Sequence, residues 1–142
     1  MRNVLERSSA RETAARVAAG AVCGQLLARY GVCMRSAVLR VGPHEVLAGA
    51  PSWDDLGSVR HDSPLVTPRP DDEEVLVEAV RAARQDGETM GGVVGAVVRG
   101  LPPGLGSYVH WDRKLDGRIV QALCSIHSVK AAAIGAGIGI GI

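Results

Sequence analysis

The sequence predicts an α+β protein, because segments with helical and with strand character mix along a single chain of 142 residues. Their order is helix, strand, irregular stretch, helix, strand, loop and helix, with no internal repeat. Apolar residues make up 46% of the chain and charged residues 22%, which is close to the globular average and argues against disorder over the whole length. The length suffices for one domain of ordinary size.

The first predicted helix covers residues 10–30, which are rich in good helix formers. Ser9 stands just before it and Glu12 follows three residues later, which is the spacing of a capping box. Gly31 is suited to the left-handed conformation in which many helices end. A strand is expected next, over residues 32–41, although neither of its two faces is cleanly apolar.

Residues 42–69 are expected to be irregular, because closely spaced prolines remove backbone donors, with at most a short helix over 52–56. A second helix opens at Pro70, where four acidic residues suit the positive end of the helix dipole, and it ends at Gly87. The remaining elements are a strand over 93–99, a loop over 101–106 and a helix from residue 114 or 115 to 128.

Charge and composition exclude several functional classes. The net charge is +1, from 16 basic and 15 acidic residues, and aromatic residues make up 3%. Nucleic-acid binders usually carry a basic stripe and stacking rings, so we expect no nucleic-acid partner. No run reaches the ~20 apolar residues that cross a bilayer, and no signal-peptide pattern is present. We therefore expect no membrane partner and a cytoplasmic location.

The cysteines, histidines and acidic pairs give weak signals. Three cysteines without Cys-x-x-Cys spacing favour a reducing cytosol over a disulfide framework or a metal site. His44 and His61 are interpreted as solvated loop residues. His110 is a candidate general base, with a structural role as the favoured alternative. Asp112 and Asp116 either pair on one helix face or, as we favour, cap and solvate the third helix.

The densest cluster of chemically useful side chains lies at the start of the first long helix. Arg7, Ser8, Ser9 and Arg11 bring guanidinium and hydroxyl donors to a helix end whose free amides attract anions. This pattern allows an anion site, with a capped helix and solvated charges as the favoured alternative.

Four blocks, in this order along the chain, resemble the chorismate synthase family. They are Arg7-Ser8-Ser9-Ala10-Arg11-Glu12-Thr13 with its continuation to residue 21, residues 86–94, residues 100–106 with 111–116, and residues 121–130. On this resemblance, residues 1–130 form the central part of a chorismate synthase domain and residues 131–142 form a divergent Gly/Ile-rich tail. The implied fold is part of a β-α-β sandwich with helices packed against an antiparallel sheet.

The resemblance implies a lyase of the shikimate pathway, in aromatic amino acid biosynthesis. Such enzymes remove phosphate and a ring proton from 5-enolpyruvylshikimate 3-phosphate to give chorismate. The implied cofactor is reduced FMN, NADP is a further implied ligand, and the implied assembly is a cytoplasmic homotetramer. No metal is implied.

The resemblance also assigns site residues. The implied cofactor-binding residues are Arg7, Ser8, Ser9, His127 and Ser128, and the implied substrate-binding residue is Arg11. The family usually carries Asn or Gln where this chain has His127, but a histidine can still donate or accept one hydrogen bond.

No catalytic residue is assigned, because neither catalytic histidine of the family has a counterpart here. The family's Gly-x-Ser-His-Gly motif and its C-terminal third also lack counterparts. We therefore expect an internal fragment that is inactive by itself, binds FMN weakly and aggregates through exposed apolar surface. One alternative is a non-catalytic flavin- or anion-binding remnant that only packs with other subunits. Another is a small anion-binding module built on the Ser9 cap.

Overall fold

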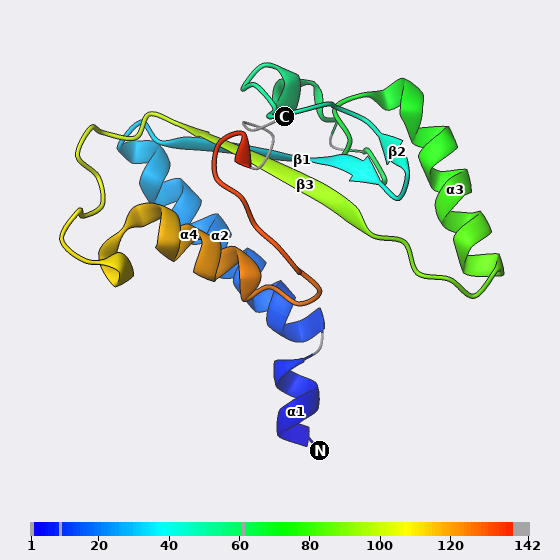
Figure 1. The fold of residues 1–142 in the computed structure, drawn as a ribbon, viewed down its shortest axis with the longest axis horizontal. Coiled ribbons are helices and arrows are strands. Elements are labelled where there is room, and N and C mark those ends of the chain that lie inside the picture. Colours follow the sequence, from blue (N-terminus) through cyan, green and yellow to red (C-terminus); the bar gives the residue numbers. More distant parts are fainter. Residues whose placement is uncertain (1, 9, 61, 138–142) are drawn as a thin grey trace. The chain divides into compact units, whose positions relative to one another are not determined.

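The computed structural model describes residues 2–8, 10–60 and 62–137 (Figure 1). Their backbone forms helices and a three-stranded sheet, so the predicted α+β class is confirmed. The chain divides into two compact units. Unit 1 comprises Met1–Cys33 and Gly100–Ile142, and unit 2 comprises Met34–Arg99.

Unit 1 consists mainly of helices. They are α1 (Arg2–Arg7), α2 (Ala10–Arg29), the 3-10 helix η3 (Trp111–Arg113) and α4 (Leu115–Cys124). Helix α2 follows Ser9 directly and ends before Gly31, whose φ of 77° matches the predicted left-handed stop. Gly100 also has a positive φ of 81°, and a Cβ there would lie 2.0 Å from the Gly31 carbonyl oxygen. The two glycines therefore let the returning chain pass close to the end of α2.

Unit 2 holds the sheet and one long helix. Its elements are β1 (Cys33–Val41), β2 (His44–Glu45), η1 (Asp55–Ser58), η2 (Pro70–Asp72), α3 (Glu73–Gln85) and β3 (Gly92–Arg99). The strand order is β2-β1-β3, and β1 pairs with β2 in antiparallel register, with Arg40 opposite Glu45. The amide of Gly42, just after β1, donates to the Gly91 carbonyl, just before β3, over 2.7 Å. The end of β1 thus lies beside the start of β3, as in an antiparallel pair.

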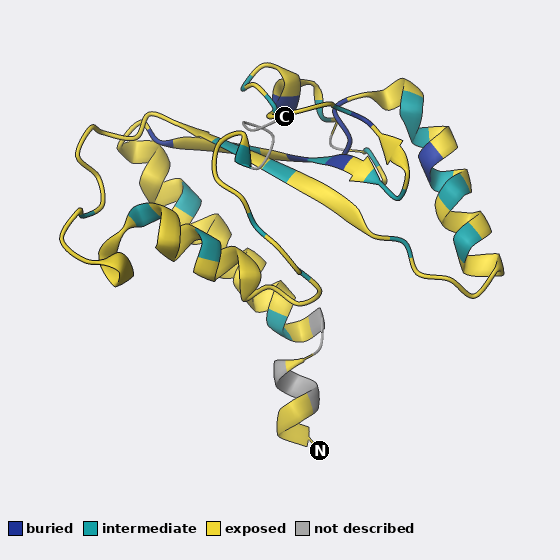
Figure 2. Cartoon of the chain, in the orientation of Figure 1, coloured by how far each residue is buried: buried dark blue, intermediate teal, exposed yellow. Residues whose placement is uncertain are grey.

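The core of unit 2 is built on β1. Ala37, Leu39 and Leu56 are buried together, with Leu47, Val59 and Val97 packed against them. Gly95 of β3 makes room for this packing, because a Cβ there would lie 2.5 Å from Leu39 Cδ1. Figure 2 shows the buried residues concentrated on β1 and the segments around it. Small and medium apolar side chains therefore form a thin core, as the composition suggests.

A second buried group ties the 63–67 turn to the start of α3. Thr67 is fully buried, and its amide donates to Ser63 Oγ over 3.1 Å. Its hydroxyl lies 3.2 Å from Glu73 Oε1, which also accepts from the Ser63 hydroxyl. The buried hydroxyl is therefore satisfied, and Leu76 of α3 is buried close by in sequence.

Several sequence predictions require correction. Helix α1 was not predicted, and β2 lies inside the stretch predicted to be irregular. The short helix predicted over 52–56 is instead the 3-10 helix η1, which ends at Ser58. The third long helix ends at Cys124 and not at residue 128, because the chain turns there and Ser128 adopts a left-handed φ of 67°.

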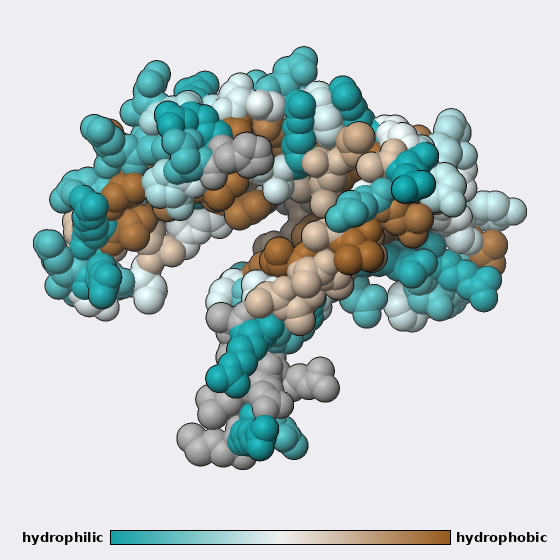
Figure 3. Space-filling view, turned by 180° about the vertical axis from the view of Figure 1, so that it is seen from behind, coloured by the Kyte–Doolittle hydropathy of each residue, from teal (hydrophilic) through white to brown (hydrophobic). Residues whose placement is uncertain are grey.

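Unit 1 leaves most of its apolar side chains exposed. Val32 is the one buried residue among those that the structure describes in this unit. On α2, Val17 and Val22 are 68% and 69% exposed, and on α4 Ile119 and Leu123 also remain partly open. Figure 3 shows apolar side chains reaching the surface on the face drawn there. Within unit 1, the helices have apolar faces that the described residues of that unit do not cover.

Candidate functional site

The predicted arginine–serine cluster lies at the junction between α1 and α2. Arg7 is the last residue of α1, and the amide of Ser8 donates to the Val4 carbonyl over 2.9 Å, closing that helix. Ser8 is an exposed bend residue, and Arg11 is exposed in the first turn of α2. Ser9 and the side chain of Arg7 lie outside the described residues, so the predicted Ser9 cap stays a prediction.

The second predicted group, His127 and Ser128, lies in a tight turn after α4. The amide of Ser125 donates to the Gln121 carbonyl over 3.0 Å, and the amide of Val129 donates to the Ile126 carbonyl over 3.2 Å. Ser128 has a left-handed backbone, which is uncommon for a residue other than glycine. The turn presents both His127 and Ser128 as exposed residues.

Within unit 1 the structure places the second group, His127 and Ser128, beside α2. Arg16 on α2 donates from Nη1 to Ser125 Oγ over 2.7 Å, across 109 positions of sequence. His127 Nε2 lies 3.9 Å from Glu12 Oε2, also on α2. The 125–128 turn therefore lies against the first turns of α2, directly after the arginine–serine cluster.

The electrostatics of this junction centre on Glu12. Its Oε1 accepts a 2.6 Å hydrogen bond from Arg16 Nε, while its Oε2 is buried and has no hydrogen-bond partner among the described residues. The Glu12 side chain is 22% exposed, so its charge is only partly hydrated. Arg16 therefore compensates the charge of the Glu12 carboxylate through Oε1.

Sequence reasoning missed the roles of Arg16 and Ser125. The i, i+4 spacing of Glu12 and Arg16 is a usable signal for a helical ion pair. No signal predicted Ser125, because its partner is distant in sequence and only folding brings the two together. Sequence reasoning also missed Trp53 in unit 2, whose ring lies about 4 Å from the guanidinium carbons of both Arg35 and Arg99.

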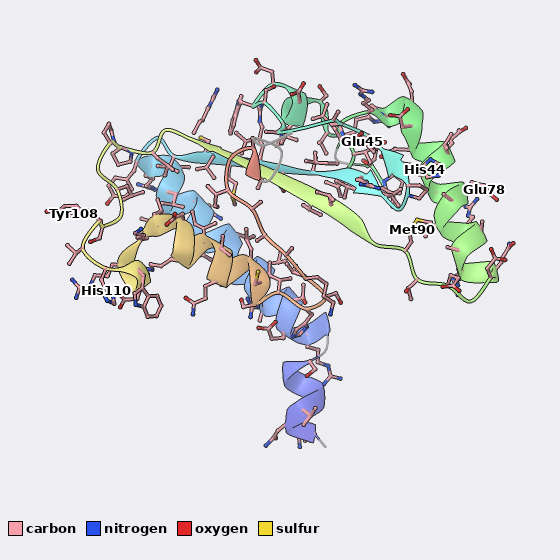
Figure 4. The ribbon with its side chains drawn as sticks, in the orientation of Figure 1. His44, Glu45, Glu78, Met90, Tyr108 and His110 are labelled. Carbon is pink, nitrogen blue, oxygen red and sulfur yellow. The ribbon has the colours of Figure 1, made fainter. Side chains whose placement is uncertain are left out.

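The other candidate residues are placed elsewhere. His110 Nδ1 lies 2.7 Å from Asp112 Oδ1 on an exposed loop, beyond Tyr108 (Figure 4). Asp112 therefore binds His110 and does not cap α4, whereas Asp116 does accept the Gly117 amide in the first turn of that helix. His44 lies on β2, as Figure 4 shows, and His61 lies outside the described residues.

The described residues contain no group of three or more His, Cys, Asp or Glu side chains that is arranged to hold a metal ion. No helix among them is both long and apolar enough to span a bilayer. Fold and site together define the class as an α+β domain that exposes Ser8 and Arg11 where the 20-residue helix α2 begins.

Comparisons with known proteins narrow this class. The family model described as chorismate synthase matches residues 1–141. A chorismate synthase of Moorella thermoacetica is 50% identical over 137 residues, covering 96% of this chain and 35% of the relative. A chorismate synthase of Carboxydothermus hydrogenoformans is 51% identical over 142 residues, covering 99% of this chain and 36% of the relative.

The structural comparison agrees. A crystal structure of chorismate synthase superposes with a TM-score of 0.86 at 39% sequence identity, covering 98% of this chain and 44% of the other. The chain belongs to the chorismate synthase family, a family of lyases in aromatic biosynthesis. It spans about a third of the length of the curated relatives named above.

Proposed function

We propose that this chain serves the chorismate synthase reaction, in which phosphate leaves 5-enolpyruvylshikimate 3-phosphate and chorismate forms. We also propose that the 142 residues do not complete this reaction by themselves. The observation that carries the proposal is the family match across residues 1–141. Support also comes from the contact of the 125–128 turn with α2, which places His127 3.9 Å from Glu12 in the first turn of that helix.

The residues of this junction suit reduced FMN. Ser8, His127 and Ser128 expose hydroxyl and imidazole groups that can meet a phosphate or the acceptor edge of a flavin. They lie near the positive end of a 20-residue helix. Reduced FMN, when bound, supplies the electron density that helps a phosphate leave in a reaction without net redox change.

The chain's own residues would bind and orient the reactants. Arg11 presents a planar guanidinium, whose fork of donors matches the phosphate or carboxylate of the substrate. Arg7, Ser8 and Ser9 would hold the cofactor from the helix start, and His127 and Ser128 would hold it from the turn. Proton removal is assigned to no residue here, since neither catalytic histidine of the family has a counterpart in the chain.

The same proposal includes the remaining expectations from the family resemblance. It assigns NADP to the supply of reduced flavin, a homotetramer to the assembled enzyme, and the cytoplasm as the location. The alternative of a non-catalytic remnant is kept as an outcome of the test below.

A segment exchange tests the proposed function. The aligned segment of the Moorella thermoacetica enzyme is replaced by this chain, and chorismate formation is measured with reduced FMN under anaerobic conditions. We expect turnover within about tenfold of the parent, because half of the residues are identical. Arg11→Ala in the exchanged segment should lower kcat/KM roughly 10- to 100-fold, the size of a lost charge-assisted hydrogen bond.

Two controls complete this test. The 142-residue chain by itself should form no chorismate above a reaction without protein. Lys130→Ala, at an exposed position after the turn, should leave the exchanged enzyme unchanged. An exchanged enzyme that folds and binds reduced FMN yet forms no chorismate would contradict the proposal and favour the non-catalytic remnant.

A further inference from the structure

A polar bridge joins α2 to the turn that follows α4, and no predicted ligand contact accounts for it. Arg16 donates to Glu12 Oε1 from Nε over 2.6 Å and to Ser125 Oγ from Nη1 over 2.7 Å. The Ser125 hydroxyl donates in turn to the Ala122 carbonyl over 2.6 Å, at the end of α4. These contacts form a continuous chain from Glu12, in the first turn of α2, to Ser125, the first residue after α4.

The second oxygen of Glu12 is the unusual part of this bridge. It is buried and accepts no hydrogen bond from any described residue, although an unpaired buried acceptor is costly. His127 Nε2 lies 3.9 Å from this oxygen, which is beyond hydrogen-bonding distance. A small movement of the 125–128 turn toward α2 would close this gap and give the carboxylate oxygen a donor.

We propose that Glu12, Arg16 and Ser125 are positioning residues, which fix the turn carrying His127 and Ser128 against the start of α2. In this arrangement Glu12 Oε2 is the acceptor that orients the His127 ring. For its ligand, FMN, the inference rests on the proposed function. It concerns how the start of α2 and the 125–128 turn, the two segments proposed to contact the flavin, are held at a fixed distance from each other.

Because the bridge is partly exposed to solvent, its role in positioning the 125–128 turn can be distinguished from a contribution to folding stability. The side chains of Arg16 and Glu12 are 40% and 22% exposed, and ion pairs that reach solvent contribute little to folding stability. Their geometry is nevertheless specific, because the guanidinium fork engages two partners from different parts of the chain. Loss of the bridge should therefore alter ligand binding more than it alters the melting temperature.

The test uses the 142-residue chain at submicromolar concentration and two independent readouts. Hydrogen exchange of the 125–130 segment, followed by mass spectrometry, reports whether the turn is fixed without any ligand. Fluorescence titration with FMN reports binding. The variants are Glu12→Gln and Ser125→Ala, with Ser125→Thr as the conservative variant that keeps the hydroxyl. Arg29→Lys, in the exposed last turn of α2, is the matched control.

We expect Glu12→Gln and Ser125→Ala to speed exchange of the 125–130 segment and to weaken FMN binding roughly tenfold. Ser125→Thr and Arg29→Lys should stay within about twofold of the original chain. Unchanged exchange in both bridge variants would overturn the inference. Faster exchange with unchanged FMN affinity would also overturn it, because the bridge would then be structural only.

Two further outcomes are distinguishable. If the original chain binds no FMN, the positioning inference fails, whereas the proposed function is still decided by chorismate formation in the exchanged enzyme. If the bridge variants still exchange faster than the original chain over residues 125–130, this would show only that the bridge fixes the turn. If a bridge variant loses its fold, hydrogen exchange rises throughout α2 and α4. The comparison of Ser125→Ala with Ser125→Thr then decides whether the Ser125 hydroxyl positions the turn, because both variants keep every charge.

Discussion

At the scale of single residues, Ser52 and Asp55 show how a short polar contact sets local chemistry. Both the amide and the hydroxyl of Ser52 donate to Asp55 Oδ2, over 2.8 Å and 2.6 Å, and the Asp55 amide donates back to Ser52 Oγ over 3.2 Å. These hydrogen bonds favour the charged carboxylate and hold the pKa of Asp55 below its ordinary value. This reciprocal pattern resembles a capping box, and it links Ser52 to Asp55, the first residue of the 3-10 helix η1.

This geometry makes a prediction about pH. A carboxylate with a lowered pKa in the folded state stabilises the fold above its ordinary pKa, and that contribution is lost as pH falls through the lower value. Ser52→Ala should raise the pKa of Asp55 toward the ordinary value. Carboxyl NMR titration in dilute acid, where the 16 basic residues keep the chains apart, measures the change. Ser58→Ala, also in η1, is the control, and an unmoved Asp55 titration in Ser52→Ala would refute this assignment.

At the scale of elements, glycines decide how closely two segments of unit 1 can approach each other. Gly100 follows β3 and lies against the Gly31 carbonyl at the end of α2, so it has both a positive φ and no room for a side chain. Gly104 has a similar φ of 83°, but a Cβ there would meet nothing within 4 Å. A comparison of Gly100 with Gly104 therefore separates the cost of a positive φ from the cost of a steric clash at Cβ.

We predict that Gly100→Ala destabilises the fold more than Gly104→Ala. Both variants place alanine at a positive φ, which costs about 1–2 kcal/mol. Gly100→Ala additionally forces Cβ into a carbonyl oxygen, which should add about 1–3 kcal/mol. Urea denaturation followed by circular dichroism measures the difference. Equal losses in the two variants would show that the close approach of Gly100 to Gly31 is not maintained in solution.

At the scale of the whole molecule, exposed apolar surface is the dominant feature. The helices of unit 1 present valines, leucines and isoleucines that the described residues of that unit leave open, whereas unit 2 buries a small core on β1. Each buried residue in this core is small or of medium size, so the hydrophobic stabilisation is modest. The chain also spans about a third of its curated relatives.

We therefore predict that the 142-residue chain self-associates at micromolar concentration. Light scattering after size-exclusion chromatography should detect oligomers or aggregates. The double variant Val17→Lys with Val22→Lys should reduce association by removing two exposed apolar side chains from α2. Thr13→Lys with Gln25→Lys adds the same charge at exposed polar positions and should have a smaller effect. A monodisperse, cooperatively melting monomer would argue against this prediction.

Local patterns in the sequence predicted most of the elements. The helix formers between Ser9 and Gly31 predicted the bounds of α2 closely. The acidic turn after Pro70 predicted α3 but placed its start too early, because Pro70–Asp72 form the 3-10 helix η2 and α3 begins at Glu73. Local patterns failed for β2, which has two residues and is defined by its pairing with β1. They also failed for the end of α4, where the turn at Ser128 ends the helix early.

The sequence by itself determined the family, the α+β class and the residues expected to contact cofactor and substrate, because motif identity and short-range periodicity are properties of neighbouring residues. Only the tertiary structure decided that the start of α2 meets the turn after α4. That meeting depends on Arg16 reaching Ser125 and on His127 facing Glu12. A contact between residues more than a hundred positions apart follows from how the chain packs, and no local pattern encodes it.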